Sequence, residues 1–212
     1  MSDSVKRLMT EEQQDTLPEV INIATGRTAA SLSALAGQRV HIEIPELDLL
    51  TLPELIVQLN HMTDGEVATV QQVFGGAFQG MALLLLDQPG AIELVSKLVG
   101  GRVQSGRLDT SSQEVLVEVG NMLLNACIGS FGNLLKVHLS FSVPRIMQQV
   151  AGDILSTLTI EGQGITHALM IHTIFRLSGD AIQGRLVILL GVTSLDRLLS
   201  AIQKLSESVH NA

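Results

Sequence analysis

The chain has 212 residues, of which 46% are hydrophobic, so it can bury a substantial core. Five Phe residues are the only aromatic side chains and the net charge is −8, which argues against a base-stacking platform or a basic nucleic-acid surface. Apolar runs such as 81–86 and 186–192 are too short to span a membrane, and the polar N-terminal stretch lacks the apolar segment of a signal peptide. We therefore expect a soluble, cytoplasmic protein that binds neither nucleic acid nor membrane.

The predicted elements form two similar series in chain order, read from helical and alternating apolar patterns. The first half is expected to hold a long helix over 16–36, a strand over 39–44, a short helix over 53–60, strands over 66–74 and 78–86, and a helix over 91–99. The second half is expected to hold a long helix over 112–135, a strand over 137–143, a short helix over 145–151, strands over 167–177 and 182–190, and a helix over 194–206.

Local signals mark where these elements begin and end. Thr16 is predicted to cap the first long helix, with Pro18 in its first turn, and Ser111 with Glu114 is read as a capping box for the second. Pro45 and Pro144 are predicted to end the two short strands, because proline cannot donate to a strand ladder. Gly75-Gly76 and Ser178-Gly179-Asp180 are predicted turns, and Gly100–Thr110 is the predicted link between the halves.

One spaced pattern of polar residues occurs twice, offset by 99 residues. Its copies are Asp15, Glu19, Asn22 and Pro45, and Glu114, Glu118, Asn121 and Pro144. A further match, offset by 104, pairs Gln79-Gly80 with Gln183-Gly184. We therefore predict a single domain over 1–212 made of two repeats, 11–100 and 110–208. The predicted fold class is α+β, with pseudo-twofold symmetry and a mainly antiparallel sheet packed with long helices.

The repeated pattern places an acid and an amide three residues apart on each long helix. Residues at i, i+4 and i+7 lie on one face, so Glu19 with Asn22, and Glu118 with Asn121, should each share a face with the preceding carboxylate. Helix capping would explain Glu114, and the helix dipole would explain Asp15. A single Glu-x2-Asn is usually a solvated helical edge, but two copies at the same offset favour a duplicated polar site.

Here the chain resembles the CheC/CheX/FliY family of chemotaxis phosphatases, in which an Asp/Ser-x3-Glu-x2-Asn-x22-Pro pattern is typical. The run 17–35 looks like the family's first site helix, and Glu118-Val-Gly-Asn-Met-Leu-Leu-Asn looks like its second. Two copies within 212 residues favour the CheC-like branch, since FliY would carry a further C-terminal switch domain.

The resemblance implies a hydrolase that dephosphorylates a phosphorylated CheY-type response regulator. It implies two sites, Glu19 with Asn22 and Glu118 with Asn121, supported by Asp15 and Glu114. In such phosphatases the Asn carboxamide positions the attacking water, and the Glu pairs with a lysine of the receiver domain. No cofactor or metal of its own is implied, because Mg²⁺ belongs to the receiver. Family members also bind the receptor deamidase CheD, so CheD is a second candidate partner.

One departure from the family pattern concerns the residue before each site Asn, which is commonly Gly. Gly120 fits this pattern and Ile21 does not, so we expect two usable sites that are not necessarily equal. The alternative functions are a non-catalytic adaptor for the phosphorylated receiver or CheD, and a component of the flagellar switch.

The remaining reactive residue types suggest no second site. Cys127 is the only cysteine and falls in an apolar helical run, which favours a buried hydrophobic side chain over a reactive thiol. The six histidines form no metal-ligand pattern that the sequence can show.

Overall fold

The computed structural model describes residues 9–62, 65–100, 107–150, 153–154 and 164–210. In this part of the chain five helices and seven strands form one mixed α+β unit, as the sequence predicts. The elements are α2 (Glu11–Ala36), β1 (Val40–Thr51), α3 (Leu52–Asn60), β2 (Glu66–Gly76), β3 (Gly80–Asp87), α4 (Gln88–Val99), α5 (Thr110–Leu135), β4 (Leu139–Phe141), β5 (Arg145–Val150), β6 (Ile165–Leu177), β7 (Asp180–Gly191) and α7 (Val192–His210).

The strands form a single antiparallel sheet in the order β1-β6-β7-β3-β2-β4, and β5 also pairs with β2. Strands β7 and β3 meet at the centre, and each half contributes its first strand to the opposite edge. The order is therefore the same from either edge once each strand is exchanged for its counterpart in the other half. Two repeats related by a pseudo-twofold axis would produce this order, and the division into 11–100 and 110–208 stays a prediction.

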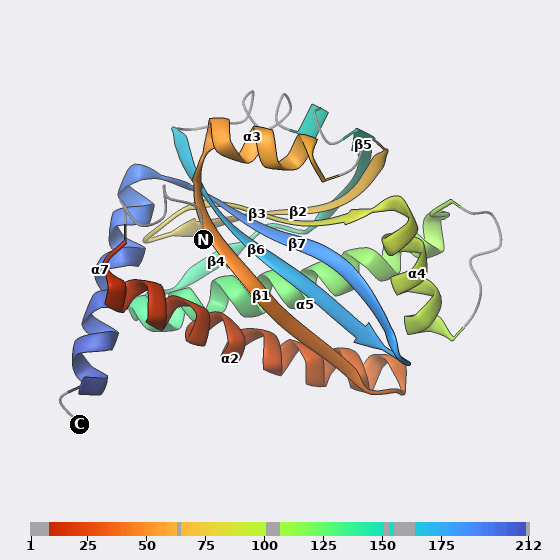
Figure 1. The fold of residues 1–212 in the computed structure, drawn as a ribbon, viewed down its shortest axis with the longest axis horizontal. Helices are drawn as coiled ribbons and strands as arrows, with labels where there is room; N and C mark the ends of the chain where they lie inside the picture. Colours follow the sequence, from red (N-terminus) through yellow and green to blue (C-terminus); the bar gives the residue numbers. More distant parts are fainter. Residues whose placement is uncertain (1–8, 63–64, 101–106, 151–152, 155–163, 211–212) are drawn as a thin grey trace.

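Helices cover the two faces of the sheet unequally (Figure 1). The main core lies between one face and α2, α4, α5 and α7, and it includes Leu17, Leu123, Phe74 and Phe175. A smaller cluster lies on the other face, where Leu55 and Leu59 of α3 pack against the sheet. Figure 1 shows α2 and α5 side by side under the sheet and running in opposite directions. Each of them therefore has one face toward the core and one toward solvent.

Helix α5 is long and apolar enough to cross a membrane by length and composition alone. The sequence-based expectation considered only uninterrupted apolar runs and did not anticipate this. Leu116, Leu123 and Phe131 of α5 are nevertheless fully buried in the main core of this unit. The apolar character of α5 is accounted for by packing within the fold.

Both long helices begin earlier than predicted. Thr10 caps α2, because its hydroxyl accepts a hydrogen bond from the Gln13 backbone N–H and the Gln13 side chain bonds back to the Thr10 backbone. Pro18 therefore lies inside α2 and not in its first turn. Asp109 caps α5 by accepting from the Ser112 backbone N–H at 2.8 Å. The predicted caps at Thr16 and Ser111 are wrong, since in each case a better acceptor precedes the apolar pattern.

The two prolines of the repeated pattern have different structural roles. Pro45 does not end a strand: β1 continues to Thr51, and its register with β6 shifts between Glu43 and Glu46. A bulge on an edge strand tolerates a residue that cannot donate. Pro144 does lie outside the strands, between β4 and β5. The short helix predicted from residue 145 is wrong, because Arg145–Val150 pairs with β2 as β5.

The long hairpins are confirmed, but only one of their predicted turns is. Ser178 and Gly179 both have positive φ, 51° and 92°, and they connect β6 directly to β7. Gly75 and Gly76 are instead part of β2, because β4 pairs with them through Ser140 and Leu139. The β2–β3 connection therefore falls at residues 77–79. The predicted link Gly100–Thr110 lies mostly outside the described residues.

Candidate functional site

The three polar residues of the first copy lie on the solvent face of α2. Asp15, Glu19 and Asn22 are all exposed, whereas Leu17 and Ile21 between them are buried in the core. Asp15 lies within the helix, beyond its acidic first-turn residues Glu11 and Glu12. The predicted clustering on one face is therefore what the structure shows. A simple dipole role for Asp15 loses support, because the dipole acts mainly on the first turn.

The second copy occupies the corresponding face of α5. Glu114 and Glu118 are exposed and Asn121 is half-buried. Glu114 does not form the predicted capping box, since Asp109 is the cap and Glu114 lies beyond the first turn. The structural explanation of Glu114 is thus removed, and a carboxylate one turn before Glu118 remains without a role in helix capping.

The carboxamide of Asn121 is held by neighbouring amides. Its Oδ1 accepts a hydrogen bond from Asn125 Nδ2 at 2.8 Å and lies at a long 3.5 Å from Gln72 Nε2 of β2. Gln72 is buried, and its Nε2 also donates to the Ser142 backbone carbonyl at 3.0 Å. The half-burial of Asn121 therefore reflects contacts with the sheet edge and with the next turn of α5.

The residue before each site Asn sets how close the helix lies to its strand. Gly120 is buried, and a Cβ placed on it would lie 2.5 Å from Val70 Cγ1 of β2. At the corresponding position Ile21 fills the core with its side chain and is 1% exposed. Asn22 next to it is exposed, and so is the apolar Ile23. The two Glu/Asn pairs thus occupy the same helical positions, but the residues that pack beneath and beside their Asn side chains differ.

Comparison with known proteins extends this picture, although no family model matches the chain. The curated protein CheY-P phosphatase CheC of Bacillus subtilis (strain 168) is 28% identical over 167 residues, covering 77% of this chain and 79% of that protein. The solved structure of Thermotoga maritima FliY has a TM-score of 0.75 with 19% identity, covering 93% of this chain and 98% of that chain. The chain is thus similar in sequence to a CheC protein and in fold to a FliY protein.

Other solved structures share this fold. The FliM middle domain of H. pylori has a TM-score of 0.65 with 14% identity, covering 91% of this chain and 99% of that chain. The CheX-CheY-BeF3-Mg+2 complex of Borrelia burgdorferi has a TM-score of 0.54 with 17% identity, covering 82% of this chain and 96% of that chain. At such identities these likenesses establish the fold.

Cys127 belongs to the main core and not to the helix surfaces that carry the Glu/Asn pairs. It is 1% exposed in the core beneath the sheet, and burial raises the pKa of its thiol to about 12. A thiol in such surroundings stays protonated and is a poor nucleophile or metal ligand. The prediction of a buried hydrophobic side chain is confirmed.

Among the residues that the structure describes, one group of possible metal ligands comes together that the sequence did not show. Ligand atoms of Glu46, Asp48 and His172 lie within 4.8 Å of one another, and Asp48 Oδ2 is 3.4 Å from His172 Nε2. The group arises because β1 pairs with β6, which no local spacing reveals. Arg185 of β7 is the cross-strand neighbour of His172 on β6. Its positive guanidinium disfavours the binding of a metal cation beside it. The expectation that the protein holds no metal of its own stays a prediction.

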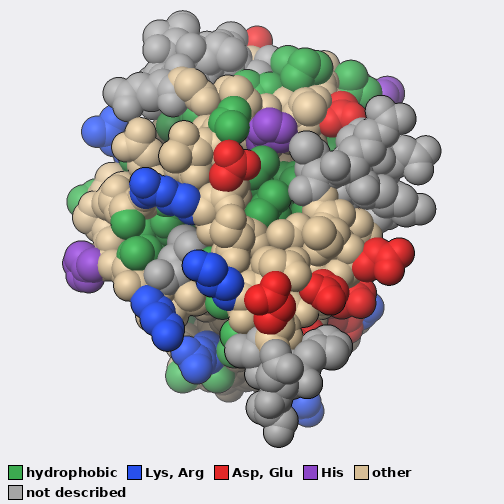
Figure 2. All heavy atoms as spheres, turned by 90° about the vertical axis from the view of Figure 1, so that its left-hand side faces the viewer, with side chains coloured by type: hydrophobic (Ala, Val, Ile, Leu, Met, Phe, Trp, Pro, Cys, Tyr) green, Lys and Arg blue, Asp and Glu red, His purple; other side chains and the backbone are tan. Residues whose placement is uncertain are grey.

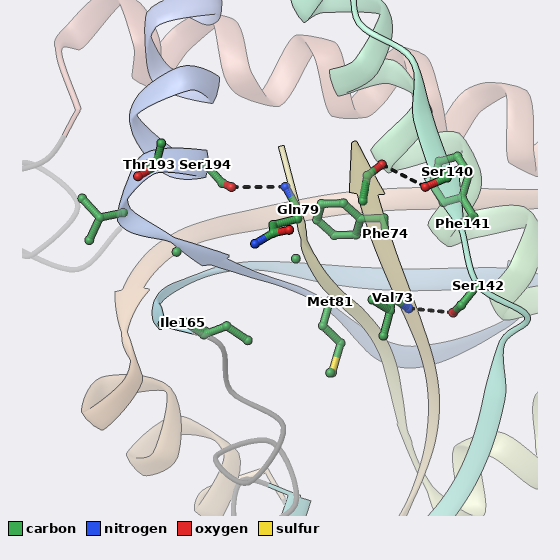
Figure 3. Close-up of a pocket in the computed structure, with 15 residues that line it drawn as sticks. Val73, Phe74, Gln79, Met81, Ser140, Phe141, Ser142, Ile165, Thr193 and Ser194 are labelled. Carbon is green, nitrogen blue, oxygen red and sulfur yellow. Dashed lines mark hydrogen bonds between the residues drawn. The ribbon is translucent and has the colours of Figure 1, made fainter. Parts of the chain in front are cut away.

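The larger cavities lie apart from the Glu/Asn pairs. One of about 750 Å³ is lined by hydroxyls and apolar side chains, among them Ser194, whose Oγ accepts from the Gln79 backbone N–H (Figure 3). Another of about 870 Å³ lies beside α7 and is lined by Lys136, Arg197 and Lys204 among others. Figure 2 shows the end of the molecule that carries α7, with basic side chains gathered on one side and acidic ones on the other. Chemistry at the pairs would therefore take place on an open surface.

Proposed function

We propose that this chain is a hydrolase that removes the phosphoryl group from the aspartyl-phosphate of a CheY-type response regulator in chemotaxis signalling. One observation carries the proposal: an acid and an amide recur at the same positions on two surface helices, in a chain 28% identical to a CheY-P phosphatase. The proposed catalytic residues are Glu19 and Asn22 in one site, and Glu118 and Asn121 in the other. Asp15 and Glu114 are proposed to assist partner binding.

The chemistry demands little of the protein. An aspartyl-phosphate is already activated, so hydrolysis needs mainly a water held in line with the P–O bond to the aspartate. The water oxygen bonds to phosphorus, the bond to the aspartate oxygen breaks, and inorganic phosphate leaves the restored carboxylate. A carboxamide suits this task, because it donates and accepts hydrogen bonds without adding negative charge beside a phosphoryl group.

The surface position of both pairs fits a substrate that is itself a folded protein. Asn22 and Asn121 lie on the outer faces of their helices. A docked receiver domain could therefore contact either side chain with its phosphorylation site. The neighbouring Glu would pair with a lysine of the receiver and orient the docked partner. The receiver would supply both the phosphorylated aspartate and Mg²⁺. A CheY-type partner places the protein in the cytoplasm, and CheD is proposed as a second partner.

The competing function is an adaptor that binds the phosphorylated receiver or CheD without hydrolysis. A second alternative is a component of the flagellar switch. The fold shared with the FliM middle domain is compatible with both alternatives. A pure adaptor, however, has no use for a water-positioning amide in both copies. The Glu-x2-Asn pairs therefore favour the phosphatase.

A phosphate-release assay with cognate phosphorylated receivers separates these functions. The double variant Asn22→Ala/Asn121→Ala is expected to abolish accelerated phosphate loss while receiver binding persists. Asn133→Ala is the matched control, because it removes an exposed amide from α5 outside the pairs. Binding without accelerated hydrolysis by the wild-type protein would establish the adaptor and refute the phosphatase.

A further inference from the structure

The two proposed sites differ in how their amides are held, and this difference has a structural origin in α5. Gly120 allows the α5 backbone to approach Val70 of β2 closely. Gln72 follows two residues later on the same face of β2, and its side chain therefore reaches Asn121. In the other repeat Ile21 occupies the space that Gly120 leaves open, and Asn22 stays exposed.

A chain of contacts fixes which way the Asn121 amide points. The Ser142 backbone carbonyl is an obligate acceptor, so the group of Gln72 facing it must be the amino group. The same amino group faces Asn121, where an oxygen fits and a second amino group would be repelled. Asn125 donates to that oxygen at 2.8 Å from one turn further along α5. These contacts turn Nδ2 of Asn121 away from both neighbours.

The segment that orients Gln72 is itself anchored to β2. Ser142 Oγ accepts from the Val73 backbone N–H at 3.0 Å, and the Ser142 backbone N–H donates to the Val73 carbonyl at 2.9 Å (Figure 3). The carbonyl that holds Gln72 is therefore part of a pinned strand end. The network runs from the sheet edge through Gln72 to the tip of the Asn121 side chain.

The first site has no equivalent of this network at the corresponding positions. The 99-residue offset places Gly26 where the second repeat has Asn125. The hairpin registers Gln72↔Ala82 and Ile171↔Leu186, with Ala82 and Leu186 related by the 104-residue offset, place the apolar Ile171 of the second repeat where the first repeat has Gln72. The Ile171 side chain is buried in the core and offers no hydrogen-bonding group. Neither residue at these two positions holds the Asn22 side chain.

The network also carries an energetic cost. Among the residues that the structure describes, Gln72 Oε1 and Asn125 Oδ1 are buried and accept no hydrogen bond. A buried acceptor without a partner costs free energy, and a leucine at position 72 would avoid that cost. Orienting the Asn121 side chain would explain why Gln72 is a buried amide although an apolar residue would be more stable there.

We propose that Gln72 and Asn125 are positioning residues that hold the Asn121 carboxamide in one orientation, so that the second site is pre-organised and the first is not. This rests on the proposed phosphatase function. An amide already held in place loses less freedom when it orients the water, so the second site should turn over faster. Docking of the receiver does not require the held orientation, so the effect belongs in kcat and not in KM.

The test measures each site alone. Asn22→Ala leaves only the second site and Asn121→Ala leaves only the first. In the Asn22→Ala protein, Gln72→Leu and Asn125→Ala are each expected to lower kcat roughly tenfold with little change in KM. Ile171→Val in the Asn121→Ala protein is the matched control and should leave kcat of the first site unchanged. Gln72→Leu should also keep or raise Tm, which separates positioning from a merely structural role.

A second readout does not depend on activity. ¹⁵N relaxation of the side-chain NH₂ groups, assigned with Asn22→Ala and Asn121→Ala, should show Asn121 rigid and Asn22 mobile. Gln72→Leu should make the Asn121 amide mobile. An Asn121 amide as mobile as that of Asn22, or an unchanged kcat in Gln72→Leu, overturns the proposal. If the wild-type protein hydrolyses no receiver, the proposed function fails, and the relaxation measurement still decides whether the two amides are held differently.

Discussion

Gly120 of α5 and Val70 of β2 are so close that a Cβ on Gly120 would lie 2.5 Å from Val70 Cγ1. This contact sets the distance between the second site helix and the sheet. It also gives a physical reason for a glycine before the site Asn in this repeat, where any side chain would push the helix away from Gln72.

The first prediction concerns this contact. Gly120→Ala should destabilise the protein by about 1–3 kcal/mol through overpacking against a branched side chain. Gly129→Ala is the matched control in the same helix: nothing lies within 4 Å of its added Cβ, so it should stabilise by about 0.5–1 kcal/mol. Urea denaturation measures both. Adding Val70→Ala should ease the strain of Gly120→Ala, and equal effects of the two glycine changes would contradict the contact.

The sequence predicts what is periodic and what is repeated. Alternation and helical spacing locate the long hairpins and both long helices, and the 99-residue offset places Glu19, Asn22, Glu118 and Asn121 on two solvent faces. These features depend on neighbours a few residues apart along one chain segment. The roles of the six proposed site residues stay predictions that the assays above test.

Features that depend on pairing between distant segments are not readable from the sequence. Residues from Arg145 form β5 because β2 offers an open edge, although their local pattern also suits a helix. Gly75-Gly76 joins β2 because β4 lies beside it. Gln72 meets Asn121 for the same kind of reason. Predicting the contact between Gln72 and Asn121 would have required knowing how β2 pairs with β4 and where α5 packs on the sheet.

A second prediction concerns the thiol of Cys127. Because burial raises its pKa to about 12, the thiolate is essentially absent near neutral pH in the folded protein. Native protein should therefore react with a thiol reagent only as fast as it opens, and urea-unfolded protein should react at once. The time course of mass increase by alkylation checks this. Rapid labelling of the fully folded protein would show that the residue is accessible.

A third prediction concerns the cap of α5. Hydrogen bonds from the Ser112 hydroxyl and backbone N–H lower the pKa of Asp109 below its usual value. A lowered folded-state pKa stabilises the fold above the unfolded pKa of about 3.9, and this contribution is lost as pH falls through the folded pKa. Asp109→Ala should therefore lower the denaturation midpoint more at about pH 7 than at about pH 3.

Asp109→Asn is the control for that measurement, since asparagine caps a helix without titrating in this range. Its difference from wild type should change less between the two pH values than the difference for Asp109→Ala. A deficit of Asp109→Ala that is the same at both pH values would contradict a role of the ionised carboxylate.

The last prediction concerns the charge of the two site acids. Glu19 and Glu118 are exposed, and on the proposed function each pairs with a lysine of the docked receiver. Glu19→Gln/Glu118→Gln keeps the size of both side chains and removes the charge, so the Kd for a BeF₃-activated receiver should rise about two- to tenfold at low salt. Salt screens exposed charges, so the difference should shrink as ionic strength rises. Glu66→Gln removes an exposed carboxylate outside both helices and should leave Kd unchanged, whereas an equal effect of Glu66→Gln would mean that net charge alone attracts the receiver.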